Sequence, residues 1–314
     1  MPKQMIESLQ PGEPVDSVFL VVESSLRTTR TGSSYLTVKL ADRTGQLDGK
    51  LWDASEAVAG SVAPDDFVHV KGKAESYRND IQINIRSITK ADTDGLRLRE
   101  FLKESERDPE EMMKEMIGLL AQVEDPDYRA LLDAFLQDEE LCKGFRTAPA
   151  AMRNHHAYLG GLLEHTLSMM HLALKIMEHY NTLRRDVLLT GVFLHDVGKV
   201  QELACKRTFS MTLPGQLVGH IVLGVLMLEE KAGTIEAFPE EKLNMMRHLI
   251  LSHHGQREYG SPKLPMFAEA IALHYVDNLD AKLKEFDEAI AGDKNADPHL
   301  TDYARLFETR LYKG

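Results

Sequence analysis

The first third of the chain alternates apolar and polar residues in short runs, as strands with one buried face do. Clusters of Gly, Asp, Asn and Pro separate these runs and mark tight turns. The runs predict five strands, at residues 18–22, 35–40, 46–52, 67–72 and 81–85. Five short strands joined by short turns are typical of a small closed β-barrel, which we assign to residues 1–92.

Beyond this segment, apolar residues recur at helical spacing. The pattern predicts a helical connector, a helical domain and a C-terminal helical tail, at residues 93–150, 151–290 and 291–314. The tail could pack on the bundle or on another subunit, so a homo-oligomer is one outcome. The predicted fold class is therefore multidomain, with a five-stranded barrel followed by an all-α bundle.

The most apolar of the predicted helices ends in two polar residues. Residues 188–194 are apolar apart from Thr190, and His195 and Asp196 follow directly. Gly198 is the expected helix stop. Two adjacent polar side chains at the end of a buried helix are costly unless partners satisfy them. A metal ion is the partner that we predict.

Further metal-binding side chains lie on apolar faces of other predicted helices in the C-terminal half. They are His165, His220, His253, His254 and Asp277. A single histidine in such a place is more often a satisfied core residue than a ligand. Because these residues accompany His195 and Asp196 on separate predicted helices, the group favours a shared metal site.

The order of these residues resembles the HD superfamily of metal-dependent phosphohydrolases, whose helical bundle holds metals in its core. The resemblance implies that one ion is held by His165, His195, Asp196 and Asp277. It also implies that Asp196 bridges to a second ion held by His220, His253 and His254. Nitrogen and carboxylate ligands suit Mn²⁺, Fe²⁺, Co²⁺ and Zn²⁺. The resemblance favours Mn²⁺, with two ions per chain.

Net charge and composition limit the classes of partner that the protein can bind. The 314 residues carry a net charge of −12, which excludes a broad basic surface for nucleic acid. Residues 1–91 are nearly neutral, with 11 Lys plus Arg against 12 Asp plus Glu. No apolar run approaches the roughly 18 residues that span a bilayer, and no signal peptide is evident. With two cysteines outside any CxxC pair, a cytoplasmic protein without a membrane partner is expected.

The barrel segment carries its own binding chemistry. The stretches LTVKLADRTGQLDGKLWDAS and FVHVKGKAESYRNDIQINI resemble the OB-fold of anticodon-binding and single-strand-binding proteins. Basic residues interleaved with aromatic ones can follow phosphates and stack bases. The candidates for nucleic-acid binding are Arg27, Arg30, Tyr35, Lys50, Trp52, Lys71, Tyr77 and Arg78. In the alternative interpretation, Trp52 is barrel core and the charges form a solvated face.

An OB-fold followed by this HD domain narrows the resemblance to the YhaM family of 3′→5′ exoribonucleases. Its specific pieces include GQLDGKLWD, FLHDVGK and LHYVDNLDAK. The resemblance implies hydrolysis of single-stranded RNA from the 3′ end by a metal-activated hydroxide, with single-stranded DNA as a further substrate. The Gly-Tyr-Pro element of HD enzymes that act on cyclic dinucleotides is absent after His254, which disfavours that substrate class.

Further roles follow from the same resemblance. Asp196 and Lys199 are the expected catalytic residues, with the Lys199 ammonium near a phosphoryl oxygen. The alternative for Lys199 is a cation favourably placed at a helix C-terminus. His155 and His156 are candidates for contact with substrate phosphate, and His274 for support behind the ligands. Two other functions stay open: a small-nucleotide phosphohydrolase with a regulatory or oligomerisation barrel, and a non-catalytic RNA-binding protein with a structural metal.

Overall fold

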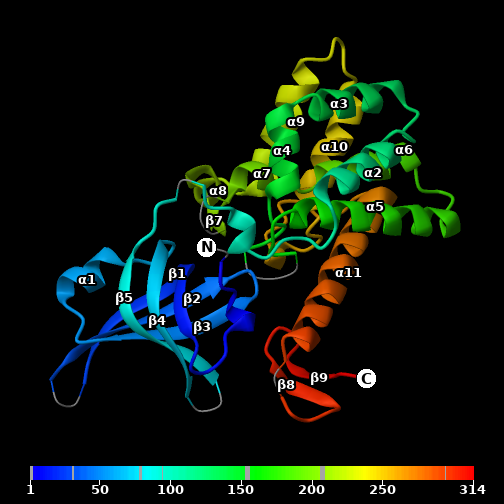
Figure 1. Ribbon diagram of the computed structural model, residues 1–314. Coiled ribbons are helices and arrows are strands. Elements are labelled where there is room, and N and C mark those ends of the chain that lie inside the picture. The colour runs from blue at the N-terminus through cyan, green and yellow to red at the C-terminus, as the bar shows by residue number, and fades with distance from the viewer. Residues whose placement is uncertain are drawn as a thin grey trace. The chain divides into compact units, whose positions relative to one another are not determined.

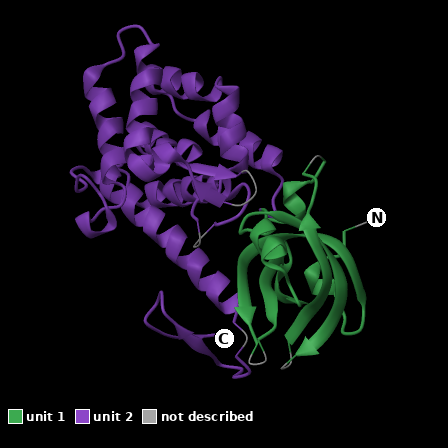
Figure 2. Cartoon of the chain, turned by 90° about the vertical axis from the view of Figure 1, so that its left-hand side faces the viewer, with its two compact units in different colours: residues 1–104, 206–208 green, residues 105–205, 209–314 purple. Residues whose placement is uncertain are grey.

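The chain forms two compact units, each described here by itself (Figure 2). Unit 1 comprises residues 1–104 and 206–208, and unit 2 comprises residues 105–205 and 209–314. The computed structural model describes residues 3–29, 32–77, 80–93, 95–152, 156–205, 209–293 and 295–314. Within these residues, no helix is both long enough and apolar enough to cross a membrane.

Unit 1 is a closed five-stranded barrel, as the alternating pattern predicts (Figure 1). Its strands are β1 (Pro14–Thr28), β2 (Ser34–Asp42), β3 (Gly45–Trp52), β4 (Phe67–Tyr77) and β5 (Asp80–Lys90). Their order around the barrel is β1-β2-β3-β5-β4, in which only the β3–β5 pair is parallel. Short helices lie beside them: η1 (Ile6–Ser8), α1 (Glu56–Ser61) and η2 (Leu98–Glu100).

Strand β1 is much longer than the predicted apolar run of residues 18–22, because it pairs with two neighbouring strands. Residues 14–20 of β1 pair with β4, and residues 20–28 pair with β2. A register shift between Val21 and Glu23 separates the two halves, and irregularities of this kind bend a strand. The long, bent β1 therefore closes the barrel, and Phe19 lies fully buried inside it.

Unit 2 is a helical bundle with two small hairpins (Figure 1). The helices are α2 (Pro109–Leu120), α3 (Pro126–Leu136), α4 (Glu139–Thr147), α5 (Gly161–His179), α6 (Arg185–Leu194), α7 (Lys199–Glu202), α8 (Leu213–Leu217), α9 (His220–Gly233), α10 (Glu240–Ser252), η3 (Arg257–Tyr259) and α11 (Ala268–Ala291). The strands are β6 (Leu203–Cys205), β7 (Phe209–Met211), β8 (Leu300–Ala304) and β9 (Thr309–Tyr312).

The predicted connector supplies three helices to the core of the bundle. Asp108 and Asp125 cap α2 and α3, accepting hydrogen bonds from backbone amides, and a proline begins each helix. Phe135 and Phe145 pack against Phe193 of α6, with ring centroids 5.9 and 5.5 Å apart. These helices thus share one hydrophobic core with α5, α6, α9 and α10.

The predicted C-terminal helix is wrong, because β8 and β9 form an antiparallel hairpin there. Leu311 is buried, whereas Tyr303 and Tyr312 are exposed. So few apolar residues in a short segment fit a helical period and a strand period almost equally well. Hydrogen bonds across the hairpin decide between the two.

Candidate active site

The site is built around the end of α6. Every residue of α6 from Val187 to Leu194 is buried. Gly191 lets α10 approach closely, since a Cβ there would lie 2.6 Å from Leu249 Cδ1. His195 caps the helix, and Asp196 follows in the turn that leads into α7. The apolar packing of α6 therefore holds both polar side chains inside the bundle.

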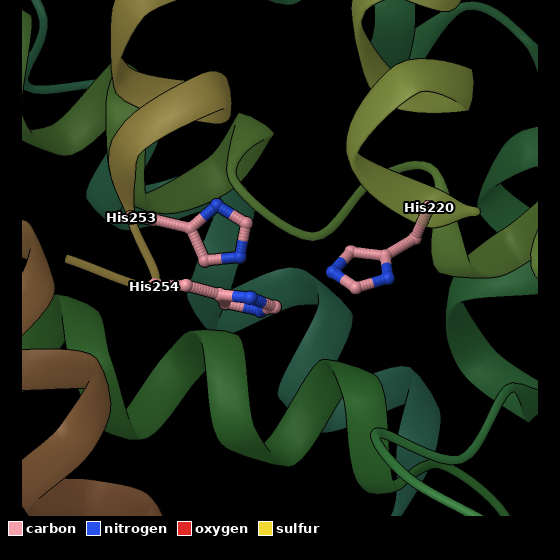
Figure 3. Close-up of side chains that lie close together, drawn as sticks. All are labelled: His220, His253 and His254. Atoms are coloured by element: carbon pink, nitrogen blue, oxygen red, sulfur yellow. The ribbon is translucent and has the colours of Figure 1, made fainter. Parts of the chain in front are cut away.

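Six of the predicted ligand residues form two groups, and within each group the ligand atoms lie within 4.8 Å of one another. The first group is His165, His195 and Asp277, and the second is His220, His253 and His254. Figure 3 shows the second group, in which His220 from the start of α9 faces the two histidines at the end of α10. The fold thus brings together residues from α5, α6, α9, α10 and α11.

Asp196 lies between the two groups. Its Oδ1 atom is 3.5 Å from His220 Nε2 and 3.6 Å from His253 Nε2. Its other oxygen, Oδ2, is 3.3 Å from His195 Nε2. Each carboxylate oxygen therefore faces one group, which is the arrangement that a bridging ligand needs.

Each of the five clustered histidines turns its Nδ1 atom away from the centre and towards an oxygen. The pairs are His195 with Val192 O (2.8 Å), His253 with Ile250 O (2.7 Å), His254 with Tyr259 O (2.7 Å), His165 with Asp280 Oδ2 (2.7 Å) and His220 with Glu202 Oε1 (3.1 Å). A carbonyl or ionised carboxylate oxygen can only accept, so the proton lies on Nδ1. In this orientation the Nε2 atoms face the centre, where they can bind a metal.

Several buried atoms at the centre lack a hydrogen-bond partner. Among the described residues, no hydrogen bond reaches Nε2 of His195, His220 or His253, or Oδ1 of Asp196. A buried polar atom without a partner costs about 1–3 kcal/mol. Divalent cations bind neutral imidazole nitrogens and carboxylate oxygens, so these residues fit the predicted metal ions.

The electrostatics differ between the two groups: His253 and His254 of the second group favour the neutral form, whereas His165 of the first group favours the protonated form beside two carboxylates. Burial lowers the pKa of His253 well below its usual value, and it also lowers the pKa of His254. Burial would raise the pKa of Asp277, but its hydrogen bond to His165 outweighs that effect and lowers it. For His165, burial is likewise outweighed, and Asp277 and Asp280 raise its pKa to about 9.

A cavity of about 290 Å³ lies beside these residues. Asp196, His254 and Asp277 form one part of its lining. The rest of the lining includes Lys199, Tyr259, His274, Asn278, Lys282 and Glu285. Ligand pockets begin at about 300 Å³, so the cavity has room for one small group next to the candidate metal ligands.

The barrel presents aromatic and basic side chains on its outer face. Tyr35 pairs with Trp52 across β2 and β3, and their ring centroids are 5.1 Å apart. Trp52 is 49% exposed, so it is not part of the barrel core. Arg27 is exposed and pairs with Tyr35 from β1. The three residues form one row across neighbouring strands.

A second contact on the barrel joins Lys50 to Tyr77. The Lys50 ammonium lies 4.7 Å from the centroid of the Tyr77 ring, which is 48% exposed. Lys71 is engaged elsewhere, because its ammonium is 3.4 Å from Asp16 Oδ2 on β1. Arg30 and Arg78, also predicted to bind nucleic acid, lie outside the described residues.

Comparison with known proteins agrees with both halves of this description. The HD-domain profile matches residues 162–282, and a profile for an OB-fold nucleic acid binding domain matches residues 20–91. The 3'-5' exoribonuclease YhaM of Bacillus subtilis is 38% identical over 280 residues, which cover 89% of this chain and 88% of that protein. The chain belongs to the YhaM family. YhaM of Listeria monocytogenes serotype 4b is 35% identical over 292 residues, 92% of each chain.

In this YhaM-family chain, Lys199 lies directly against Asp196. Its ammonium is 2.6 Å from Asp196 Oδ2, and it also lines the cavity. Burial would lower the pKa of Lys199, but the Asp196 charge outweighs burial and raises it. Lys199 begins the short helix α7, and α6 already ends at Leu194, so Lys199 is not a cation at the C-terminus of α6.

Gly198 has a different role from the predicted helix stop. The preceding helix already ends at Leu194, and Gly198 keeps right-handed helical geometry as the chain enters α7. A Cβ at Gly198 would lie 2.0 Å from the carbonyl oxygen of His220. The missing side chain therefore lets the start of α9 approach closely and brings His220 next to Asp196.

Two acidic residues behind the ligands were missed from the sequence. Asp280 accepts hydrogen bonds from His165, His156 and Ser168. Glu202 accepts from the backbone amide of His220 at 2.9 Å and from its ring. Asp280 follows Asp277 by three residues on one helix, and this spacing is the signal that could have indicated it.

The predicted contact between His156 and substrate phosphate does not agree with its position. His156 is 3% exposed, its Nδ1 atom is 2.7 Å from the Tyr158 hydroxyl, and its Nε2 atom is 3.2 Å from Asp280 Oδ2. It therefore supports Asp280 from behind. His274, as predicted, also lies behind a ligand, with Nδ1 2.9 Å from the carbonyl oxygen of His253. His155 lies outside the described residues.

Proposed function

We propose that this chain is a metal-dependent 3′→5′ exoribonuclease that hydrolyses single-stranded RNA. The observation that carries the proposal is Asp196, whose two oxygens face separate groups of imidazole nitrogens beside a cavity. The YhaM relatives, which match about nine-tenths of the chain, are 3'-5' exoribonucleases, and this activity supports the proposed substrate and direction. Single-stranded DNA is a second polymer that the same chemistry would accept.

The proposed metal ligands follow the two groups. We assign one divalent cation to His165, His195 and Asp277, and a second to His220, His253 and His254, with Asp196 shared. The donor set of nitrogen and oxygen atoms supports Mn²⁺, although Fe²⁺, Co²⁺ and Zn²⁺ accept the same donors. When bound, two such cations supply a deprotonated water as nucleophile and polarise the phosphoryl oxygens.

The chain's own residues prepare that chemistry. The acceptors at Nδ1 fix each imidazole in one orientation and one tautomer, so no reorganisation is needed at the centre. Lys199 holds Asp196 by an ion pair and lines the cavity. We propose that its ammonium also stabilises the negative charge that develops on a phosphoryl oxygen.

The barrel would hold the rest of the strand. In the row of Arg27, Tyr35 and Trp52, the exposed Arg27 and Trp52 offer a positive charge and a stacking surface, and Lys50 beside Tyr77 adds a second such pair. Stacking on aromatic side chains tolerates any base, as a degradative enzyme requires. Lys71 is a weaker candidate, because Asp16 already neutralises part of its charge.

The direct test uses purified protein, Mn²⁺ and RNA labelled at the 5′ end. Stepwise shortening from the 3′ end is expected, which a blocked 3′ end should stop and a blocked 5′ end should not affect. Internal cleavage of circular RNA would contradict an exonuclease. The alternative is a phosphohydrolase that acts on small nucleotides, and the small size of the cavity is compatible with it. Hydrolysis of free nucleotides in the same assay tests this alternative. A cytoplasmic location and a homo-oligomer stay predictions.

A further inference from the structure

The cavity beside the candidate metal ligands has one aromatic side chain that contributes nothing to the core. Tyr259 belongs to the short helix η3 between α10 and α11, and it lines the cavity together with His254 and Asp277. Tyr259 is 61% exposed. A large exposed ring leaves apolar surface in contact with water, and a planar ligand stacked on the ring would cover that surface.

The backbone of Tyr259 is held firmly although its ring is exposed. Its carbonyl oxygen accepts from Nδ1 of His254 at 2.7 Å, and its amide donates to the carbonyl oxygen of Gln256 at 3.2 Å. Gly260 follows with a φ of 83°, a left-handed conformation that favours glycine and ends η3. Main-chain contacts thus fix the backbone of Tyr259 relative to a candidate metal ligand, which places its ring beside the cavity.

The remaining lining of the cavity suits a nucleotide. Lys199 and Lys282 bring two ammonium groups, and Asn278 brings an amide. Lys282 is 2.8 Å from Glu285, which orients its ammonium and offsets part of its charge. Cations near a phosphate and an aromatic ring near a base are the two contacts that nucleotide-binding sites combine.

We propose that Tyr259 is the stacking platform for the base of the nucleotide at the 3′ end of the strand. This inference rests on the proposed exoribonuclease function and specifies how its site recognises the leaving nucleotide. The ring accepts any of the four bases, since every base has an aromatic face. Recognition then requires a base next to the cleaved phosphodiester but not a particular base.

The test compares the binding of two probes that differ only in the base. AMP and ribose 5-phosphate are titrated calorimetrically into the Mn²⁺-loaded full-length protein and its variants. Wild type is expected to bind AMP about tenfold more tightly than ribose 5-phosphate, within the range known for stacking of one base. Tyr259→Ala should bring the ratio close to one, and Tyr259→Phe should keep it. The carbonyl that His254 contacts remains in both variants.

Tyr180→Ala is the matched control, because Tyr180 is 58% exposed and is not among the residues that line the cavity. Its ratio should equal that of wild type. Equal binding of the two probes by wild type, or an unchanged ratio in Tyr259→Ala, overturns the inference. A wild-type protein that discriminates between the probes through Tyr259 but leaves RNA intact would instead contradict the exoribonuclease function, so the two failures are distinct.

Discussion

The two units place their candidate functional side chains in opposite ways. In the bundle, histidines and carboxylates are buried, and each imidazole is oriented by a hydrogen bond on its outer nitrogen. On the barrel, the Trp52 and Tyr77 rings are about half exposed and contact Tyr35 and Lys50 on other strands. Hydrolysis at one phosphorus atom requires ligand atoms in fixed positions. Binding of single-stranded RNA of any sequence requires exposed rings that can stack on different bases.

The comparison predicts that bundle substitutions act on metal and turnover, and the largest effect is expected for Asp196→Ala. Asp196 faces both groups, so its loss should remove bound metal and lower turnover by well over 100-fold, since losing even an outer partner of a ligand typically costs 10–100-fold. Elemental analysis measures the bound metal, RNA hydrolysis measures turnover, and circular dichroism is expected to show that the helical fold is kept. Near-wild-type turnover would remove Asp196 from the mechanism.

His220→Ala should affect one of the two candidate ions. His220 belongs to the second group only, so the metal content at saturating Mn²⁺ should fall from about two ions per chain to about one, because the first group is intact. The measurement is elemental analysis after desalting. If wild type itself held no more than one ion, the two-ion mechanism would be abandoned.

Asp280→Asn tests support from behind the ligands. Asp280 accepts from His165 at 2.7 Å, so the substitution should weaken Mn²⁺ binding by about 10–100-fold while the ligands themselves stay in place. Calorimetric titration with Mn²⁺ gives the affinity. Asp287→Asn is the control, since Asp287 is exposed on the same helix. Equal Mn²⁺ affinity in both variants would argue that Asp280 has no positioning role.

Trp52→Ala should produce the smallest change and affect only RNA binding. The ring is 49% exposed and packs on Tyr35, so its removal should weaken binding of long RNA by about 1–3 kcal/mol and leave hydrolysis of a small phosphodiester unchanged. Trp52→Phe keeps a stacking ring and should retain most of the affinity. An unchanged RNA affinity in Trp52→Ala would show that this face of the barrel does not bind RNA through Trp52.

Strands and helices with a regular repeat of apolar residues could be predicted from the sequence. The alternating runs identify all five strands, because one face of each strand points into the barrel. The helices that carry the candidate ligands are predicted from apolar residues at helical spacing. The order of the ligands supports the HD resemblance. The tail of 291–314 shows the limit, since a few apolar residues did not distinguish a helix from the hairpin of β8 and β9.

Contacts between distant segments depended on the tertiary structure. His165 and Asp280 are 115 residues apart, and nothing in the local pattern of either residue predicts their hydrogen bond. The burial of His156 and the close approach that Gly198 permits likewise depend on which helices meet. The sequence therefore determined the two fold classes and the candidate ligands. Only packing decided which atoms face the centre, because hydrogen-bond partners are chosen by proximity in space rather than along the chain.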